Sequence, residues 1–107
     1  MIKVSVMYPY VADARFDHDY YRDRHMPLIQ KLLGAACSYY TIDKGISGGE
    51  HDSTPPYVGM CHIFSESLEA FGAAMAVSGK DIFSDIPNYT DIAPVTQISD
   101  VVIGFVG

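Results

Sequence analysis

The segment FDHDYYRDRHMPL, residues 16–28, decides the first helix of the fold and holds the side chains of greatest chemical interest. Asp17 is of a type that caps helix N-termini, and Phe16 and Tyr21 have the spacing of a hydrophobic staple around that cap. The pattern therefore predicts a helix from about residue 18 to Leu33.

A proline lies inside this predicted helix, two positions after a histidine. Pro27 has no N–H to donate to the carbonyl of Asp23, so we expect the helix to bend or begin afresh near His25. Gly34 is placed to end it. The apolar periodicity directs one stripe of side chains towards the rest of the protein. The members of this stripe are Tyr21, His25, Leu28, Ile29 and Leu32.

Outward from this helix, alternating or β-forming runs predict four strands, and a second periodic segment predicts another helix. The strands are IKVSVMY at 2–8, the run around 39–42, YVGMCHIF at 57–64 and VTQISDVVIGFV at 95–106. The helix is SESLEAFGAAMAVSG at 65–79, capped by Ser65 or Ser67, and an irregular stretch follows at 80–94. The order β-α-β-β-α-β predicts an α+β, ferredoxin-like sandwich: a four-stranded antiparallel sheet with two helices on one face, in one domain over residues 1–107.

The charge balance is acidic, with seven Lys and Arg against thirteen Asp and Glu and a net charge of -6. Because phosphate binding needs a basic face, we expect no nucleic-acid partner. The N-terminal residues are too polar for a signal peptide and no apolar run reaches roughly 18 residues, so we expect no membrane association and a cytoplasmic location. Cys37 and Cys61 are then expected to be reduced core residues.

Apolar residues occur on both faces of the predicted sheet. In the strands at 57–64 and 95–106 both alternating sets include large apolar side chains, so neither face is expected to be polar. A protein of this size rarely exposes such a face to water. The predicted cover is a second copy of the chain, sheet against sheet, in a twofold homodimer.

His25 has two interpretations. As a core residue, it would be satisfied by a tyrosine hydroxyl or a backbone carbonyl. As a functional residue, its neutral imidazole would exchange a proton with a phenol, enol or alcohol held among apolar walls, with Tyr21 orienting it or binding the same oxygen. The eight tyrosines and five phenylalanines suffice to line such a pocket, and would equally serve as an ordinary core.

Metal and phosphate chemistry is disfavoured by spacing. The four histidines show no H-x-x-x-H or carboxylate spacing typical of a metal site, and the two cysteines do not form C-x-x-C. The glycines of GISGG, residues 45–49, lack the Lys-Ser/Thr ending of a phosphate loop and join two predicted strands. We therefore predict neither a metal nor a cofactor.

The segment at 16–28 also resembles the motif of the ethyl tert-butyl ether degradation (EthD) family, a phenylalanine and two tyrosines followed by H-x-P-L. The resemblance continues through SLEAF and DIPNYTD, and so covers nearly the whole chain. It implies a dimeric α+β barrel, built from two paired ferredoxin-like sheets, with a small apolar ligand held between sheet and helices. The residues that match the motif are Phe16, Tyr20, Tyr21, His25, Pro27 and Leu28.

Three functions follow from this resemblance and from the residues. The first is a binding protein for a small hydrophobic or aromatic metabolite, accessory to oxidative degradation such as ether catabolism. The second is a cofactor-independent enzyme of monooxygenase, dehydratase or isomerase type, an oxidoreductase or lyase in the first two cases, with His25 as general acid or base and Tyr21 as the second catalytic residue. The third is a purely structural dimeric module, since fold alone does not choose a reaction. The predicted ligand-binding residues are Phe16, Tyr20, Leu28 and Tyr89.

Overall fold

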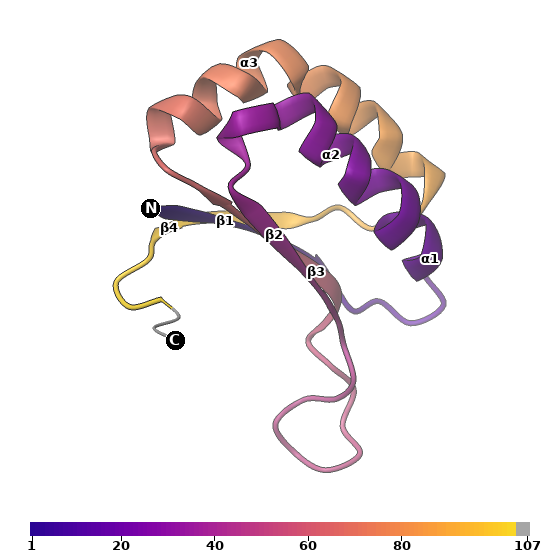
Figure 1. Ribbon diagram of the computed structural model, residues 1–107. Coiled ribbons are helices and arrows are strands. Elements are labelled where there is room, and N and C mark those ends of the chain that lie inside the picture. Colours follow the sequence, from indigo (N-terminus) through magenta and orange to yellow (C-terminus); the bar gives the residue numbers. More distant parts are fainter. Residues whose placement is uncertain (105–107) are drawn as a thin grey trace.

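Four antiparallel strands form one sheet, and the helices cover one of its faces (Figure 1). The computed structural model describes residues 1–104. The sheet order is β2-β3-β1-β4, which confirms the predicted β-α-β-β-α-β, ferredoxin-like arrangement. The strands are β1 (Ile2–Pro9), β2 (Tyr39–Lys44), β3 (Tyr57–Ser65) and β4 (Val95–Asp100).

The first helical layer begins as the sequence predicts. The Asp17 side chain accepts a hydrogen bond from the backbone N–H of Tyr20, at 3.0 Å. The rings of Phe16 and Tyr21 lie 5.2 Å apart between centroids, which closes the staple. The layer consists of α1 (His18–Tyr20), a π-helical turn η1 (Tyr21–His25), α2 (Met26–Leu33) and a 3-10 turn η2 (Gly34–Ala36).

A π-helical turn, η1, accommodates the proline inside the first helical segment. The N–H of Met26 donates to the carbonyl of Tyr21, and α2 restarts with Pro27 in its first turn, where a missing N–H costs least. A π turn holds one extra residue, so the buried positions that follow are moved on by one. Ile29 and Leu33 are buried, whereas the predicted Leu28 and Leu32 are only half-buried. The predicted stripe is corrected accordingly.

Helix α3 (Leu68–Asp85) is longer than the predicted segment 65–79. Ser67 is its N-cap and accepts a hydrogen bond from the N–H of Ala70, at 3.0 Å. The small, buried pair Ser78 and Gly79 does not end the helix but sits within it, where a short side chain permits close packing. The helix continues to Asp85 and passes into the 3-10 turn η3 (Ile86–Asn88), so the predicted irregular stretch is wrong over 80–85.

The last strand is shorter than predicted. β4 ends at Asp100, and residues 101–104 leave the sheet, with Val102 and Ile103 largely exposed. The part of the predicted strand from residue 105 onward lies outside the described residues. Within residues 1–104, no helix combines the length and the apolar composition that crossing a bilayer requires.

The two faces of the sheet differ in polarity. Val4, Cys61 and Ile63 point towards the helices and are buried there. The opposite face carries a polar row across its middle, formed by Thr41, His62, Ser5 and Gln97. The expectation that neither face is polar was therefore wrong, because alternation within each single strand does not show which side chains align across the sheet. The homodimer itself stays a prediction.

Candidate functional site

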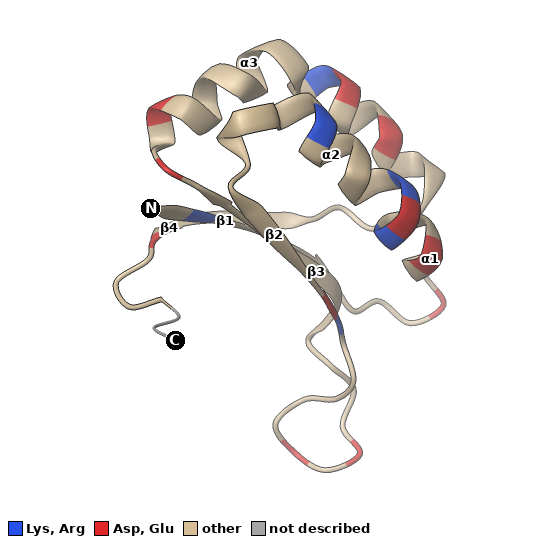
Figure 2. Ribbon diagram, in the orientation of Figure 1, with Lys and Arg blue, Asp and Glu red and all other residues tan. Residues whose placement is uncertain are grey.

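A cavity of about 120 Å³ lies between the helices and the sheet. It reaches the surface beside α3 and β4, where Phe83 and Ile98 line it and are 60% and 46% exposed. Its walls are mostly apolar, and no Asp, Glu, Lys or Arg among residues 1–104 lines it. The lining residues are Val4, Val6, Tyr8, Tyr21, His25, Ile29, Leu33, Cys61, Ile63, Phe71, Met75, Ile82, Phe83, Ile86, Pro94, Thr96 and Ile98. The charged residues of the helices, coloured in Figure 2, are exposed, except Asp85 at the end of α3, which is half-buried.

His25 ends the π-helical turn and lines this cavity with only 2% of its surface exposed. Its Nδ1 donates to Asp85 Oδ2 at 2.9 Å. Its ring stacks on that of Tyr21, with 5.7 Å between centroids, and lies against that of Tyr89 at 4.5 Å. Burial lowers the pKa of the His25 imidazole, and Asp85 opposes this only in part. The imidazole is therefore neutral near pH 7.

The second ring nitrogen of His25 is free. Among residues 1–104, Nε2 has no hydrogen-bond partner. Nε2 is also not completely buried. Among residues 1–104, Tyr21 Oη is the one side-chain nitrogen or oxygen that is both completely buried and without a hydrogen-bond partner. Since the residue lines the cavity, Nε2 is the one ring nitrogen left to meet a ligand there.

Asp85, the last residue of α3, is the partner that the sequence did not reveal. Its Oδ1 accepts hydrogen bonds from Tyr20 Oη at 2.7 Å and from Asn88 Nδ2 at 2.9 Å. Burial alone would raise the pKa of this carboxyl, but the hydrogen bonds from Tyr20, Asn88 and His25 outweigh burial and lower the pKa. Asp85 is thus held as a carboxylate against His25.

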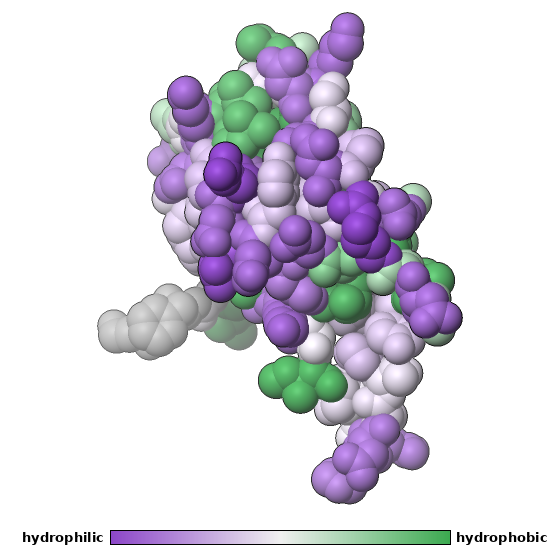
Figure 3. Space-filling view, turned by 90° about the vertical axis from the view of Figure 1, so that its right-hand side faces the viewer, coloured by the Kyte–Doolittle hydropathy of each residue, from purple (hydrophilic) through white to green (hydrophobic). Residues whose placement is uncertain are grey.

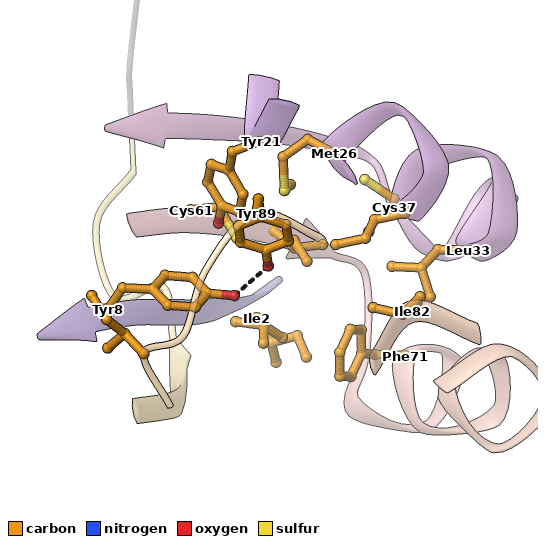
Figure 4. Close-up of a cluster of buried hydrophobic side chains, with 14 residues drawn as sticks. Ile2, Tyr8, Tyr21, Met26, Leu33, Cys37, Cys61, Phe71, Ile82 and Tyr89 are labelled. Atoms are coloured by element: carbon orange, nitrogen blue, oxygen red, sulfur yellow. Dashed lines mark hydrogen bonds between the residues drawn. The ribbon is translucent and has the colours of Figure 1, made fainter. Parts of the chain in front are cut away.

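Tyr8, Tyr21 and Tyr89 form one aromatic cluster (Figure 4), in which Tyr21 and Tyr89 contact His25, and their hydroxyls differ. Tyr8 Oη and Tyr89 Oη share a hydrogen bond of 2.6 Å. Tyr21 Oη has no nitrogen or oxygen partner among the described residues and faces the thiol of Cys61, a weak hydrogen-bonding group. Burial raises the pKa of Tyr8 to about 12 and raises the pKa of Tyr21 and Tyr89 further, so all three stay protonated at neutral pH.

Of the six predicted site residues, His25 and Tyr21 line the cavity and four do not. Tyr20 points to Asp85 instead, Tyr89 packs behind His25, and Phe16 closes the end of the aromatic cluster against Tyr8. Leu28 is half-buried on α2. The sequence missed the cavity-lining Tyr8, although its inward position in the first strand was the available signal.

Comparison with known proteins agrees with this architecture. The family model described as EthD domain matches residues 11–93. The chain belongs to the EthD family. An EthD-like protein from Ralstonia eutropha, solved by crystallography, is 56% identical to this EthD-family chain, with a TM-score of 0.93 and with 95% of this chain and 92% of that one covered.

Two more distant crystal structures share the fold. An ethyl tert-butyl ether degradation family protein from Bacillus halodurans has a TM-score of 0.70 at 19% identity, with 94% of this chain and 97% of that chain covered. HapK from Hahella chejuensis has a TM-score of 0.62 at 10% identity, covering 100% and 99%. A search of curated proteins found no match.

The arrangement supports binding and proton transfer. An imidazole whose far nitrogen is held by a carboxylate can accept a proton at its near nitrogen and return it. The apolar walls would strengthen that hydrogen bond by excluding water. Within residues 1–104, no three His, Cys, Asp or Glu side chains lie close enough together to hold a metal ion.

Proposed function

We propose that this EthD-family chain binds a small, uncharged, mostly apolar molecule in the cavity, with one polar group of the ligand beside His25. The observation that carries the proposal is the free Nε2 of His25 in a space with otherwise mainly apolar walls. Ligand sites commonly combine apolar walls with a few polar groups that fix orientation. A purely structural module would instead fill this space with side chains.

The size and charge of the ligand follow from the cavity. An apolar cavity of about 150 Å³ is enough to bind benzene. The cavity here measures about 120 Å³ and opens at the surface, so it suits a single six-membered ring or a branched chain of similar size. A charged ligand is disfavoured because, in the part of the chain that the structure describes, no Asp, Glu, Lys or Arg lines the cavity to pair with it.

Benzene and toluene titrations followed by NMR test the proposal, together with two variants. Val6→Phe fills the cavity that Val6 lines, whereas Val77→Phe makes the same change on α3 at a position that is 85% exposed and does not line it. We expect saturable shifts at cavity residues in the wild type and in Val77→Phe, and none in a folded Val6→Phe. Absence of saturation in the wild type, or equal binding by Val6→Phe, would contradict the proposal.

The second candidate is a cofactor-independent enzyme in which His25 is the general acid or base. The hydrogen bond to Asp85 favours it, because that bond orients the ring and stabilises the imidazolium that forms on proton abstraction. Benzisoxazole, which a general base opens to a cyanophenol, is a suitable probe. We expect His25→Gln to lower the rate by about a hundredfold or more while benzene binding persists. An unchanged rate would exclude this role.

The remaining expectations are proposals of the same kind. A homodimer with the sheets facing each other fits the Tyr39 and Phe64 rings, which stack at 4.2 Å with Tyr39 48% exposed on the open face. Sedimentation at micromolar concentration tests it, and a monomer would refute it. The proposed cytoplasmic location is supported by the sequence pattern alone. A place beside an oxidative pathway such as ether degradation is supported by the family resemblance alone.

A further inference from the structure

We infer that the hydrogen-bond chain from Tyr20 and Asn88 through Asp85 fixes His25 as the Nδ1–H tautomer, so that the cavity selects molecules that donate a hydrogen bond. This inference rests on the proposed function and names its ligand class: alcohols, phenols and enols rather than ethers and ketones. A carboxylate can only accept, so the 2.9 Å contact between Asp85 and Nδ1 requires the hydrogen to be on Nδ1. Nε2 of a neutral ring then carries a lone pair.

The two carboxylate oxygens of Asp85 accept hydrogen bonds from different donors. Tyr20 and Asn88 both donate to Oδ1, which leaves Oδ2 to His25. Asn88 also lies within 3.4 Å of Tyr20 Oη, so the three polar groups brace one another. Tyr20 and Asn88 are therefore positioning residues, and Tyr20, predicted from the sequence to contact ligand, acts on the site through Asp85.

Among residues 1–104, none of the groups that face His25 is hydrogen-bonded to Nε2. Asp85 ends α3, and the ring of Tyr89 follows η3, with its hydroxyl hydrogen-bonded to that of Tyr8 of β1. From its own helical layer comes Tyr21, whose hydroxyl is sealed beside Cys61 of β3. Asp85 is thus the one ionised group facing the ring, and burial, which lowers the pKa of His25, keeps the ring neutral.

The site should therefore prefer ligands that donate a hydrogen bond over ligands that can only accept one. A ligand hydroxyl donates to Nε2, whereas an ether or ketone oxygen would meet a lone pair and stay unsatisfied in an apolar cavity, which is costly. The cavity is also lined by Tyr8, whose hydroxyl is hydrogen-bonded to that of Tyr89, and by Tyr21, whose hydroxyl is sealed beside Cys61. Thr96, on the exposed β4, is the lining hydroxyl that would serve an acceptor near the mouth. The comparison is therefore made in Thr96→Val as well as in the wild type.

The tautomer can be measured without any ligand. Histidine ring-nitrogen chemical shifts distinguish Nδ1–H from Nε2–H, and His25→Gln assigns the signal. At about pH 7.5 we expect His25 to be neutral with its hydrogen on Nδ1. Asp85→Asn should abolish the single-tautomer signature and lower the pKa of His25 further, because a raising influence is lost. The matched change Asp81→Asn, at an exposed position one turn earlier on α3, should alter neither. An Nε2–H tautomer, a charged ring, or no response to Asp85→Asn would overturn the assignment.

Cyclohexanol and cyclohexanone, which share a ring and differ in donor capacity, test the ligand class. We expect cyclohexanol to bind roughly tenfold tighter in the wild type and in Thr96→Val, and the preference to vanish in His25→Phe. As pH falls below the lowered pKa of His25, Nε2 gains a hydrogen and the ketone should gain relative to the alcohol. If benzene binds but the two compounds bind equally, the inference fails and the proposed function stands. If nothing binds, including benzene, both fail.

Discussion

The clearest test of the aromatic cluster is to remove one hydroxyl at a time. Tyr8, Tyr21 and Tyr89 are each no more than 1% exposed and differ in hydrogen bonding. Tyr8→Phe breaks the 2.6 Å bond and leaves the Tyr89 hydroxyl buried without its partner. An unsatisfied buried group costs about 1–3 kcal/mol, so the free energy of unfolding should fall by that amount.

Tyr21→Phe should have the opposite sign or no effect. Its hydroxyl has no nitrogen or oxygen partner among the described residues, so the folded state already bears the cost of burying it. Removing it relieves that cost and gives up only the weak contact with Cys61 and a small volume. We expect a change between zero and a gain of about 1 kcal/mol.

Urea unfolding at two protein concentrations measures both variants and separates any contribution of self-association. The difference between them should be at least about 1 kcal/mol, or about 4 °C in Tm. The double variant Tyr8→Phe with Tyr89→Phe should lose less than the sum of the two single losses, since no partner is then left unsatisfied. If Tyr21→Phe loses as much as Tyr8→Phe, its hydroxyl has a partner and this account of the cluster is wrong.

Three further outcomes are expected. Burial lowers the pKa of His25 below its ordinary value of about 6.5, so the unfolded chain binds the proton more readily than the folded one. The contribution of His25 to the free energy of unfolding should therefore be complete above about pH 6.5 and decrease as the pH falls towards the lowered pKa. His25→Gln should reduce this pH dependence in urea unfolding, and an unchanged dependence would contradict the prediction. Gly79→Ala should raise Tm, because alanine stabilises a helix by about 1 kcal/mol relative to glycine and position 79 is helical. The added Cβ would lie 3.4 Å from Met75 Cε, an ordinary contact distance. A lower Tm would show that the site is too tight. Gly34→Ala should cost about 1–3 kcal/mol in chemical unfolding, purely through its φ of +55°, since no atom lies within 4 Å of the added Cβ, and a neutral result would mean that the turn relaxes.

The layers of the fold were predictable because their signals are local. The cap at Asp17, the staple across it and the glycine that ends the helix each act within a few residues, and alternation marked the four strands. The cavity also lies where the resemblance placed a ligand, between sheet and helices, and His25 lines it. What local pattern could not supply was any pairing between segments far apart in the sequence.

Asp85 shows the limit most clearly. Ser-Gly at positions 78 and 79 predicted the end of a helix, since glycine has a low helix propensity. Both residues are nevertheless buried within α3, and Ser78 Oγ donates to the Leu32 carbonyl of α2 at 3.4 Å. Tertiary packing overrode propensity and carried the helix on to Asp85, sixty positions from His25. On the face viewed in Figure 3, hydrophilic side chains predominate and hydrophobic ones form several separate groups.

The proline in the H-x-P-L motif acquires a physical role from the π-helical turn. A regular α-helix advances 100° per residue, so an inserted residue rotates everything after it by about that angle relative to everything before it. Tyr21 and His25 thereby share a buried face with Ile29 and Leu33, and all four line the cavity. Without the insertion, Leu28 and Leu32 would share that face with Tyr21 and His25, as the regular helical period predicts. The turn that tolerates Pro27 therefore decides which aliphatic side chains lie beside the inward imidazole, and it puts Ile29 and Leu33 there.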